Sequence, residues 1–200
     1  MKTNLKNLLT LTLLFVTFVT LVGQSALPTI KPEDYAKWQN LGSFSITDDG
    51  SWVSWNITLV DGDDTLYIKN PASSKLYKYP LSTGLVFSTD SKWAAFRVGY
   101  SEKQIEKMTE QKKPVKNKAK LLDLTTGKER VFENISSFSL TKDAKHLIMS
   151  GYTPENSKTR DLYIYNFNTG TLKNIGNISE FSINKPGNRL AYIISAENKK

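Results

Sequence analysis

A short phrase that recurs four times constrains this chain more than any other feature of its sequence. Each copy reads as a few residues around a phenylalanine, a polar turn and then a more apolar stretch. The four phenylalanines are 43, 51 and 43 residues apart, and they are Phe44, Phe87, Phe138 and Phe181. The turns contain Asp, Asn and Gly, which tolerate the left-handed backbone of a tight hairpin. The phrase therefore predicts four copies of one β-hairpin.

A second motif lies between successive copies of the phrase. Its copies are residues 66–70, 121–128 and 162–171. Each has alternating apolar residues, and the first two lead into further alternating stretches at 75–79 and 129–132, which predicts a second hairpin. Four strands in about 40 to 45 residues are typical of a β-propeller blade. We therefore expect an all-β fold, with about four blades of four antiparallel strands in an incomplete ring. A sandwich or barrel with coincidental spacing is the alternative.

The number of repeats is small for a closed propeller. The sequence holds about four copies, and the fourth is followed only by a short polar stretch up to Lys200. Propellers usually close into a ring of about four to eight blades. We expect this chain to be the front part of a longer protein. An open ring would expose an apolar face, so we expect self-association through that edge.

The first residues resemble a secretory signal. Lys2 and Lys6 precede a mostly apolar run over residues 8–22, and small or polar residues follow up to Ser25. This order predicts export with cleavage after Ser25. An uncleaved anchor is the alternative, but a spanning helix needs about 20 apolar residues and this run is shorter. The chain has no cysteine, which excludes disulfides, thiolate metal sites and an acylated anchor.

These features divide the chain into three parts. Residues 1–25 are the predicted signal peptide, residues 26–40 a lead-in segment, and residues 41–200 the partial propeller. We expect the mature protein to be periplasmic or secreted, with no membrane contact after cleavage. The net charge of +8 comes largely from one lysine-rich insertion at 101–120 and is not interleaved with aromatic residues, so we expect no nucleic-acid binding.

The insertion at 101–120 predicts a short helix. Ser101 and Gln104 fit a capping box, and Pro114 is expected to end the helix. Ile105 and Met108 are spaced to touch the body of the protein. Lysines follow the helix, which suits either a solvated surface insertion or an anion-binding arm at the rim of a substrate site.

Residues for chemistry are scarce. There is no G-x-S-x-G nucleophile elbow, and His146, the only histidine, falls in a predicted strand, so neither a catalytic triad nor a multi-histidine zinc site is indicated. The acidic run at 61–64 fails the EF-hand spacing and is interpreted as a loop between strands. We predict no catalytic, cofactor-binding or metal-binding residues, and no cofactor. Sequons begin at Asn56, Asn134 and Asn177, and repetition accounts for the last two.

Three stretches carry a resemblance to a known family. They are the opening phrase at 38–53, the motif at 64–70 and the lysine-rich interruption before Leu121. Together they resemble the propeller of secreted bacterial members of the prolyl oligopeptidase family, serine peptidases related to dipeptidyl aminopeptidases. The resemblance covers nearly all of the mature chain, although other propellers share the turn phrase.

The resemblance implies two parts with separate roles, a propeller and a catalytic domain, and of the two this chain contains only propeller repeats. In that family the propeller gates the access of peptides to a Ser-Asp-His triad in an α/β-hydrolase domain that follows. No triad position can be carried over to residues 1–200, so peptide substrates and peptidase activity are expected only for a longer parent protein. The alternative is a non-enzymatic propeller of the cell envelope that acts as a protein-binding or scaffold module, as the translocation-associated periplasmic propellers do.

Overall fold

The computed structural model describes residues 29–195, so the predicted signal peptide lies outside the described residues. The chain divides into two units, residues 1–35 and 36–200, which are described separately. In the lead-in predicted for residues 26–40, a short 3-10 helix, η1, spans Pro32–Lys37. The first strand begins at Gln39, so the propeller starts slightly earlier than predicted.

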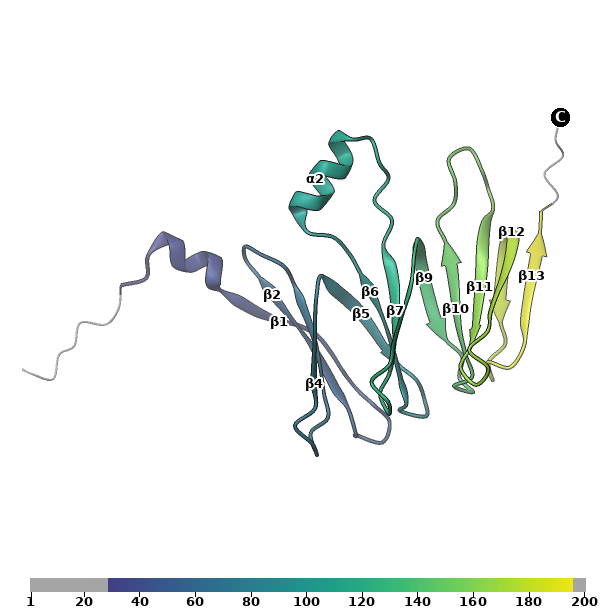
Figure 1. Ribbon diagram of the computed structural model, residues 1–200, viewed down its shortest axis with the longest axis horizontal. Helices are drawn as coiled ribbons and strands as arrows, with labels where there is room; N and C mark the ends of the chain where they lie inside the picture. The colour runs from purple at the N-terminus through teal and green to yellow at the C-terminus, as the bar shows by residue number, and fades with distance from the viewer. Residues whose placement is uncertain (1–28, 196–200) are drawn as a thin grey trace, which may run out of the picture. The chain divides into compact units, whose positions relative to one another are not determined.

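The strands form three antiparallel sheets whose order follows the chain (Figure 1). Blade 1 consists of β1 (Gln39–Ile46), β2 (Val53–Leu59), β3 (Thr65–Lys69) and β4 (Leu76–Pro80). Blade 2 consists of β5 (Ser82–Phe87), β6 (Trp93–Val98), β7 (Lys118–Asp123) and β8 (Glu129–Phe132). The third sheet holds β9 (Ile135–Leu140), β10 (His146–Gly151), β11 (Arg160–Asn166), β12 (Leu172–Ile183) and β13 (Leu190–Ile194). The predicted all-β fold of four-stranded blades in an open arrangement is confirmed.

The third sheet has five strands because β12 serves two blades. Leu172 to Ile175 pair with β11 and complete blade 3. Ile178 to Ile183 pair with β13 and form the first hairpin of the fourth repeat. The register shifts between the two halves, next to Asn177, whose φ is 57°. The fourth copy of the phrase is therefore a hairpin equivalent to β1–β2, β5–β6 and β9–β10.

The repeated phrase closes each hairpin in the same way. A hydroxyl oxygen accepts a hydrogen bond from the backbone N–H five residues later, in the pairs Thr47–Trp52 (3.0 Å), Ser88–Trp93 (2.9 Å) and Thr141–His146 (3.0 Å). In the fourth hairpin the side-chain amide oxygen of Asn184 accepts from Arg189 at 2.9 Å. Three residues after this acceptor the backbone is left-handed, at Gly50, Ser91, Ala144 and Gly187. One turn geometry thus explains the Asp, Asn and Gly content of the phrase.

The register corrects one part of the predicted repeat alignment. Phe44 pairs with Trp55, whereas Phe87 pairs with Ala94. The pair in blade 1 that is equivalent to Phe87 and Ala94 is Ile46 with Val53. Phe87 is therefore equivalent to Ile46, and its alignment with Phe44 is wrong by two residues. A shift of two keeps a side chain on the same face of a strand, so the pattern of apolar residues did not reveal it.

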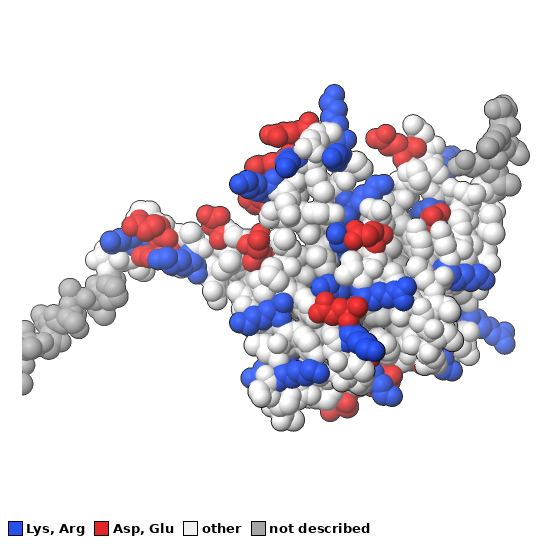
Figure 2. Space-filling model, in the orientation of Figure 1, with Lys and Arg blue, Asp and Glu red and all other residues white. Residues whose placement is uncertain are grey.

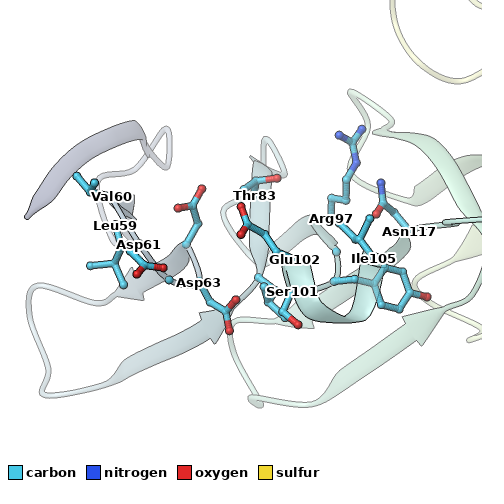
Figure 3. A pocket seen from close by; sticks show the side chains of 15 residues that line it. Leu59, Val60, Asp61, Asp63, Thr83, Arg97, Ser101, Glu102, Ile105 and Asn117 are labelled. Atoms are coloured by element: carbon cyan, nitrogen blue, oxygen red, sulfur yellow. The ribbon is translucent and has the colours of Figure 1, made fainter. Parts of the chain in front are cut away.

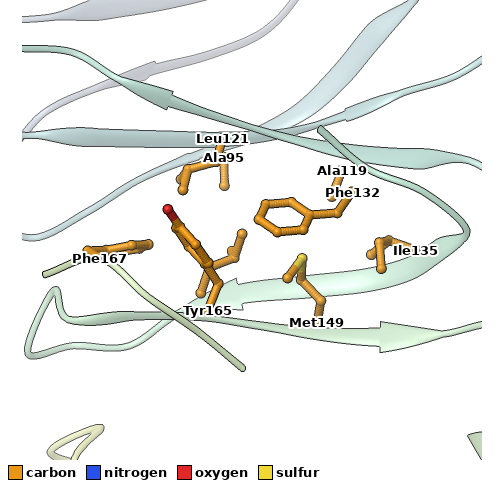
Figure 4. Close-up of a cluster of buried hydrophobic side chains, with 9 residues drawn as sticks. Ala95, Ala119, Leu121, Phe132, Ile135, Met149, Tyr165 and Phe167 are labelled. Carbon is orange, nitrogen blue, oxygen red and sulfur yellow. The ribbon is translucent and has the colours of Figure 1, made fainter. Parts of the chain in front are cut away.

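The blades pack face to face through two closed cores. Between blades 1 and 2 lie Trp52, Leu66, Ile68, Tyr79, Ala94, Phe96, Leu122 and Leu124. Between blades 2 and 3 lie Ala95, Ala119, Leu121, Phe132, Ile135, Leu147, Met149, Tyr165 and Phe167 (Figure 4). Alternate residues of β6 thus enter different cores, since Ala94 and Phe96 face blade 1 and Ala95 faces blade 3.

The opposite face of blade 1 is not covered by any of the described residues. The exposed fraction is 67% for Leu41, 79% for Phe44 and 62% for Ile46. These residues and their pairing partners on β2 lie on the face of the sheet that points away from blade 2. Self-association through this face stays a prediction.

Successive blades are joined by a residue with positive φ. These residues are Leu81, Asn134 and Asn177, with φ of 58°, 58° and 57°. Asn adopts this conformation more readily than other non-glycine residues, which is why two sequons recur at the same point. Asn56 differs, because it is 5% exposed and donates to the carbonyl of Ser82 at 2.8 Å.

Candidate functional site

The loops at one end of the blades form the surface with the most varied chemistry. This loop end comprises the connections β2–β3 (residues 60–64), β6–β7 (99–117) and β10–β11 (152–159), together with the blade junctions. The hairpin turns lie at the other end (Figure 1). Because the hairpin turns are short and uniform whereas the loops differ in length and charge, the loop end is the candidate functional site.

The first hollow on the loop end lies between blades 1 and 2 and has a volume of about 450 Å³. The β2–β3 loop contributes Asp61 and Asp63 on one side (Figure 3), and Asp64 of the same loop is also a lining residue. Arg97 of β6 and Ile105 of the insertion line the other side. The interpretation of residues 61–64 as a loop between two strands is confirmed. Within residues 29–195 no group of three or more acidic or histidine side chains is arranged to hold a metal ion.

The insertion forms α2, which spans Glu102–Glu110 and begins with the predicted capping box. The Ser101 side chain accepts from the Gln104 N–H at 3.4 Å, and the Gln104 side chain accepts from the Ser101 N–H at 2.9 Å. The prediction that Pro114 ends the helix is wrong. Lys112 is already left-handed, with a φ of 53°, and the Lys113 N–H donates to the carbonyl of Met108 at 2.8 Å. This pattern is a Schellman cap.

The helix α2 has no buried residue, so its two end caps hold it rather than the core. Ile105 is 39% exposed and borders the first hollow, while Met108 borders a separate hollow beside Lys107 and Lys113. The two apolar residues predicted to touch the body therefore line hollows beside it. Figure 2 shows positive and negative side chains intermixed over this helix.

A second hollow of about 410 Å³ lies on the loop end of blade 3. Lys116, Tyr152, Thr159 and Arg160 are among its lining residues. The Tyr152 hydroxyl accepts a hydrogen bond from the N–H of Asn117 at 3.0 Å, which ties the β10–β11 loop to blade 2. Cationic and hydroxyl groups thus meet in the second hollow beside one carboxylate, that of Asp161, whereas four carboxylates line the first hollow. Sequence reasoning missed this set, because its members are distant in sequence and no motif connects them.

His146 lies away from both hollows. It is the first residue of β10, beside a hairpin turn, and its Nε2 is 3.0 Å from the side-chain nitrogen of Asn166. Its backbone N–H donates to Thr141 as part of the repeated turn. The histidine is a strand residue, as predicted. Among residues 29–195 no helix has the length and apolar character needed to cross a membrane.

Comparison with known proteins relates this arrangement to solved propellers. No protein-family model matches the sequence, and no curated protein matches it either. The β-propeller domain of the Trilobed protease from Pyrococcus furiosus is similar, with a TM-score of 0.55, 17% identity and coverage of 80% of this chain and 50% of that domain. Acylaminoacyl peptidase from Pyrococcus horikoshii, uncomplexed, has a TM-score of 0.51 and 13% identity, with coverage of 80% of this chain and 28% of that one.

A further structure similar to this chain is an acylaminoacyl peptidase in complex with Z-Gly-Gly-Phe-chloromethyl ketone. Its TM-score is 0.50 at 14% identity, with coverage of 82% of this chain and 29% of that chain. The chain therefore spans half or less of the length of these structures. At such identities the likeness shows the fold: residues 39–194 form β-propeller blades.

Proposed function

We propose that this chain forms the first blades of the propeller of an exported serine peptidase, and that the propeller restricts the access of peptides to a hydrolase domain of the same protein. One observation carries the proposal: successive blades match the propeller domain of a protease over 80% of this chain. The resemblance of the opening phrase to the prolyl oligopeptidase family supports the same function. The blades themselves supply no nucleophile, acid or base in this scheme.

The arrangement of the blades is compatible with such a filter. The first strand of each blade contacts the first strand of the next, since β1 contacts β5 and β5 contacts β9. Inner strands that converge in this way surround the central channel of a propeller. A narrow channel admits extended peptides and excludes folded proteins, which is the physical basis of the proposed gating.

The coding sequence beyond the codon for Lys200 is the first test. An open frame that continues into further blades and a G-x-S-x-G elbow, with later Asp and His, supports the peptidase function. A stop codon directly after Lys200 would contradict it and would favour the non-enzymatic binding module.

Labelling with a fluorophosphonate probe tests the division of labour. We expect residues 26–200 alone to remain unlabelled and the full-length parent to label at its elbow serine. A Ser→Ala variant of that elbow is the matched control. Labelling of the 26–200 chain would overturn the proposal that the blades carry no nucleophile.

Export is tested by the mass of the mature N-terminus. Expression in a bacterial host followed by intact-mass analysis should give a chain that begins at Ala26. A protein that retains Lys2 and Lys6 would show that residues 1–25 are not removed.

A further inference from the structure

Arg160, at the start of β11, is a charged side chain with no hydrogen bond or ion pair to the other described residues. It is partly buried, and its Nε is shielded from solvent and makes no hydrogen bond within residues 29–195. The neighbouring carboxylate is engaged elsewhere, because Asp161 accepts from the Tyr163 hydroxyl at 3.3 Å and from Asn174 at 3.4 Å. Burial of a guanidinium N–H with no acceptor costs free energy, and a carboxylate bound to the part of the guanidinium group that lines the hollow would offset part of that cost.

A second cation borders the same hollow. Lys116 lies on the segment that leads from α2 into β7, and it forms no ion pair with any of the described residues. The next lysines behave differently: Lys118 pairs with Glu133 at 3.0 Å and Lys120 with Glu129 at 2.8 Å. Unpaired positive charge is thus directed to the second hollow, while the positive charge next to it is neutralised.

A third donor is available at this site. The Tyr152 hydroxyl accepts from Asn117 and donates to no acceptor in the described part of the chain. Its hydrogen is therefore free to point into the hollow, whose volume of about 410 Å³ is large enough for an amino-acid side chain. The hollow is also lined by the Asp161 carboxylate and the Tyr163 hydroxyl, which are hydrogen-bonded to each other. The donors left for a ligand are therefore the Arg160 guanidinium, the Lys116 ammonium and the Tyr152 phenol.

The repeat does not explain the arginine. Strand pairing shows that Lys69, Leu122 and Tyr165 occupy equivalent positions in the three blades. Arg160 lies five residues before Tyr165, so it is equivalent to Asp64 in blade 1 and to Asn117 in blade 2. At both places the backbone carbonyl accepts a hydrogen bond from a residue at the junction between blades. The Asp64 carbonyl accepts from the N–H of Leu81, and the Asn117 carbonyl accepts from the N–H of Ile135. The fold thus uses the backbone at this position and leaves the side chain free to vary, so a cation is not a structural requirement.

We propose that the second hollow is a carboxylate-binding subsite for peptides, in which Arg160 makes a two-pronged contact and Lys116 and Tyr152 supply further donors. A planar guanidinium group matches the geometry of a carboxylate better than an ammonium group does. The proposal rests on the proposed function in that its ligand is a peptide. It adds a substrate class: peptides with an acidic side chain or a free C-terminus near the loop end.

Fluorescence anisotropy with two labelled peptides tests the subsite. The probes are N-acetylated, C-amidated hexapeptides of glutamate and of glutamine, added to the whole chain. We expect the glutamate peptide to bind at least about tenfold more tightly than the glutamine peptide. Arg160→Gln should lower the affinity for the glutamate peptide by about tenfold. The matched variant Arg97→Gln, which removes the same charge from the first hollow, should change it less than about twofold.

Two further variants keep the test decisive. Arg160→Lys retains the charge but not the planar fork, so this variant should bind the glutamate peptide with intermediate affinity. Lys116→Gln tests the subsite even where Arg160→Gln fails to fold. Glu197 follows β13 in sequence and lies outside the described residues. An unchanged affinity in Glu197→Gln supports the proposal, whereas a tighter one would show that the chain's own carboxylate occupies the subsite and would overturn it.

Equal effects of the two arginine variants, or equal binding of the two peptides, would also overturn the subsite. Neither result bears on the serine peptidase, because fluorophosphonate labelling of the parent protein does not depend on Arg160. Conversely, a stop codon after Lys200 would remove the peptidase while the anisotropy difference could still be measured. The two proposals therefore fail separately.

Discussion

The interface between blades 1 and 2 and the interface between blades 2 and 3 use the same backbone repeat but hold their blades together differently. At the first interface the Tyr79 hydroxyl donates to Glu129 at 2.6 Å, and the Lys120 ammonium lies 2.8 Å from the same carboxylate and 4.8 Å from the Tyr79 ring centre. At the second interface aromatic rings dominate. Trp93 stacks on Phe167 at 4.5 Å, Phe132 meets Tyr165 at 5.4 Å, and Arg130 covers Tyr165 at 4.6 Å.

The difference shows that the propeller repeat specifies the turns and the strand register, and leaves the chemistry between blades open. The polar contact of the first interface includes one ionisable carboxyl group, that of Glu129. Burial raises the pKa of Glu129, but hydrogen bonds from Lys120 and Tyr79 and the charge of Lys120 outweigh it, so that pKa lies below its ordinary value. Burial, and then the contact with Glu129, raise the pKa of Tyr79. Among residues 29–195 no ion pair accompanies the aromatic contacts of the second interface.

The largest effect is expected from emptying a core at one interface. Phe96 is fully buried, 4.6 Å from the Tyr79 ring centre, and Phe132 is 7% exposed at the second interface. Truncation of a buried phenylalanine to alanine costs about 3–5 kcal/mol. We expect Phe96→Ala and Phe132→Ala to lower the free energy of unfolding in urea by similar amounts within this range. Val131→Ala, at a side chain 45% exposed, should cost less than about 1 kcal/mol.

A much larger loss in Phe132→Ala than in Phe96→Ala would break the comparison. It would mean that the aromatic interface carries most of the stability and that blade 1 is a weakly attached addition.

The next largest effect isolates the polar contact of the first interface. Tyr79→Phe removes a hydroxyl that donates to a carboxylate, and hydrogen bonds to charged groups contribute about 1.5–3 kcal/mol. Tyr77→Phe is the matched control on the same strand, because the Tyr77 hydroxyl is buried and has no partner within residues 29–195. We expect Tyr79→Phe to destabilise within that range and Tyr77→Phe to be neutral or slightly stabilising. Equal losses in the two variants would show that the hydroxyl–carboxylate contact contributes nothing specific.

Acid should weaken the first interface more than the second. The pKa of Glu129 is lowered in the folded protein, so its contribution is present above the ordinary glutamate value of 4.5 and is lost as the pH falls through the folded pKa. The free energy of unfolding, measured in urea at a series of pH values from 7 downwards, should therefore decline less steeply in Glu129→Gln than in the parent. Parallel curves for the two proteins would remove the pH sensitivity assigned to this interface.

The sequence predicts those features of the fold and of the candidate site that repeat along the chain, and it does not predict the features that occur once. In the turns at Thr47, Ser88 and Thr141 the hydroxyl accepts from the N–H five residues later each time, so the hairpins and blades follow directly from the repeated phrase. The hydrogen bond from Tyr79 to Glu129 joins residues far apart in sequence. It has no counterpart at the second interface within the described part of the chain, so no repeated pattern in the sequence predicts it. The same reason hides Arg160: it breaks the repeat instead of following it, and its environment exists only after folding.

The smallest predicted effect concerns a strained turn at the second interface. Ala144 has a φ of 51°, and the equivalent residues are Gly50 in blade 1 and Gly187 in the fourth hairpin. The turn of Ala144 contacts blade 2, because Thr89 donates to the carbonyl of Lys142 at 2.9 Å. Left-handed backbone costs an alanine about 1–2 kcal/mol, and the greater unfolded-state freedom of glycine offsets about 0.5–1 kcal/mol of that. Ala144→Gly should therefore raise the free energy of unfolding by about 0.5 kcal/mol.

The reverse change at the equivalent position supplies the control for this strain. A Cβ added at Gly187 would lie 2.5 Å from the backbone nitrogen of Lys142, so Gly187→Ala introduces a clash as well as the left-handed cost and should destabilise by more than about 1 kcal/mol. If Ala144→Gly instead destabilises, the turn of blade 3 is held by its contact with blade 2 strongly enough that chain entropy outweighs backbone strain. The second interface would then owe part of its stability to the rigid turn as well as to its aromatic rings.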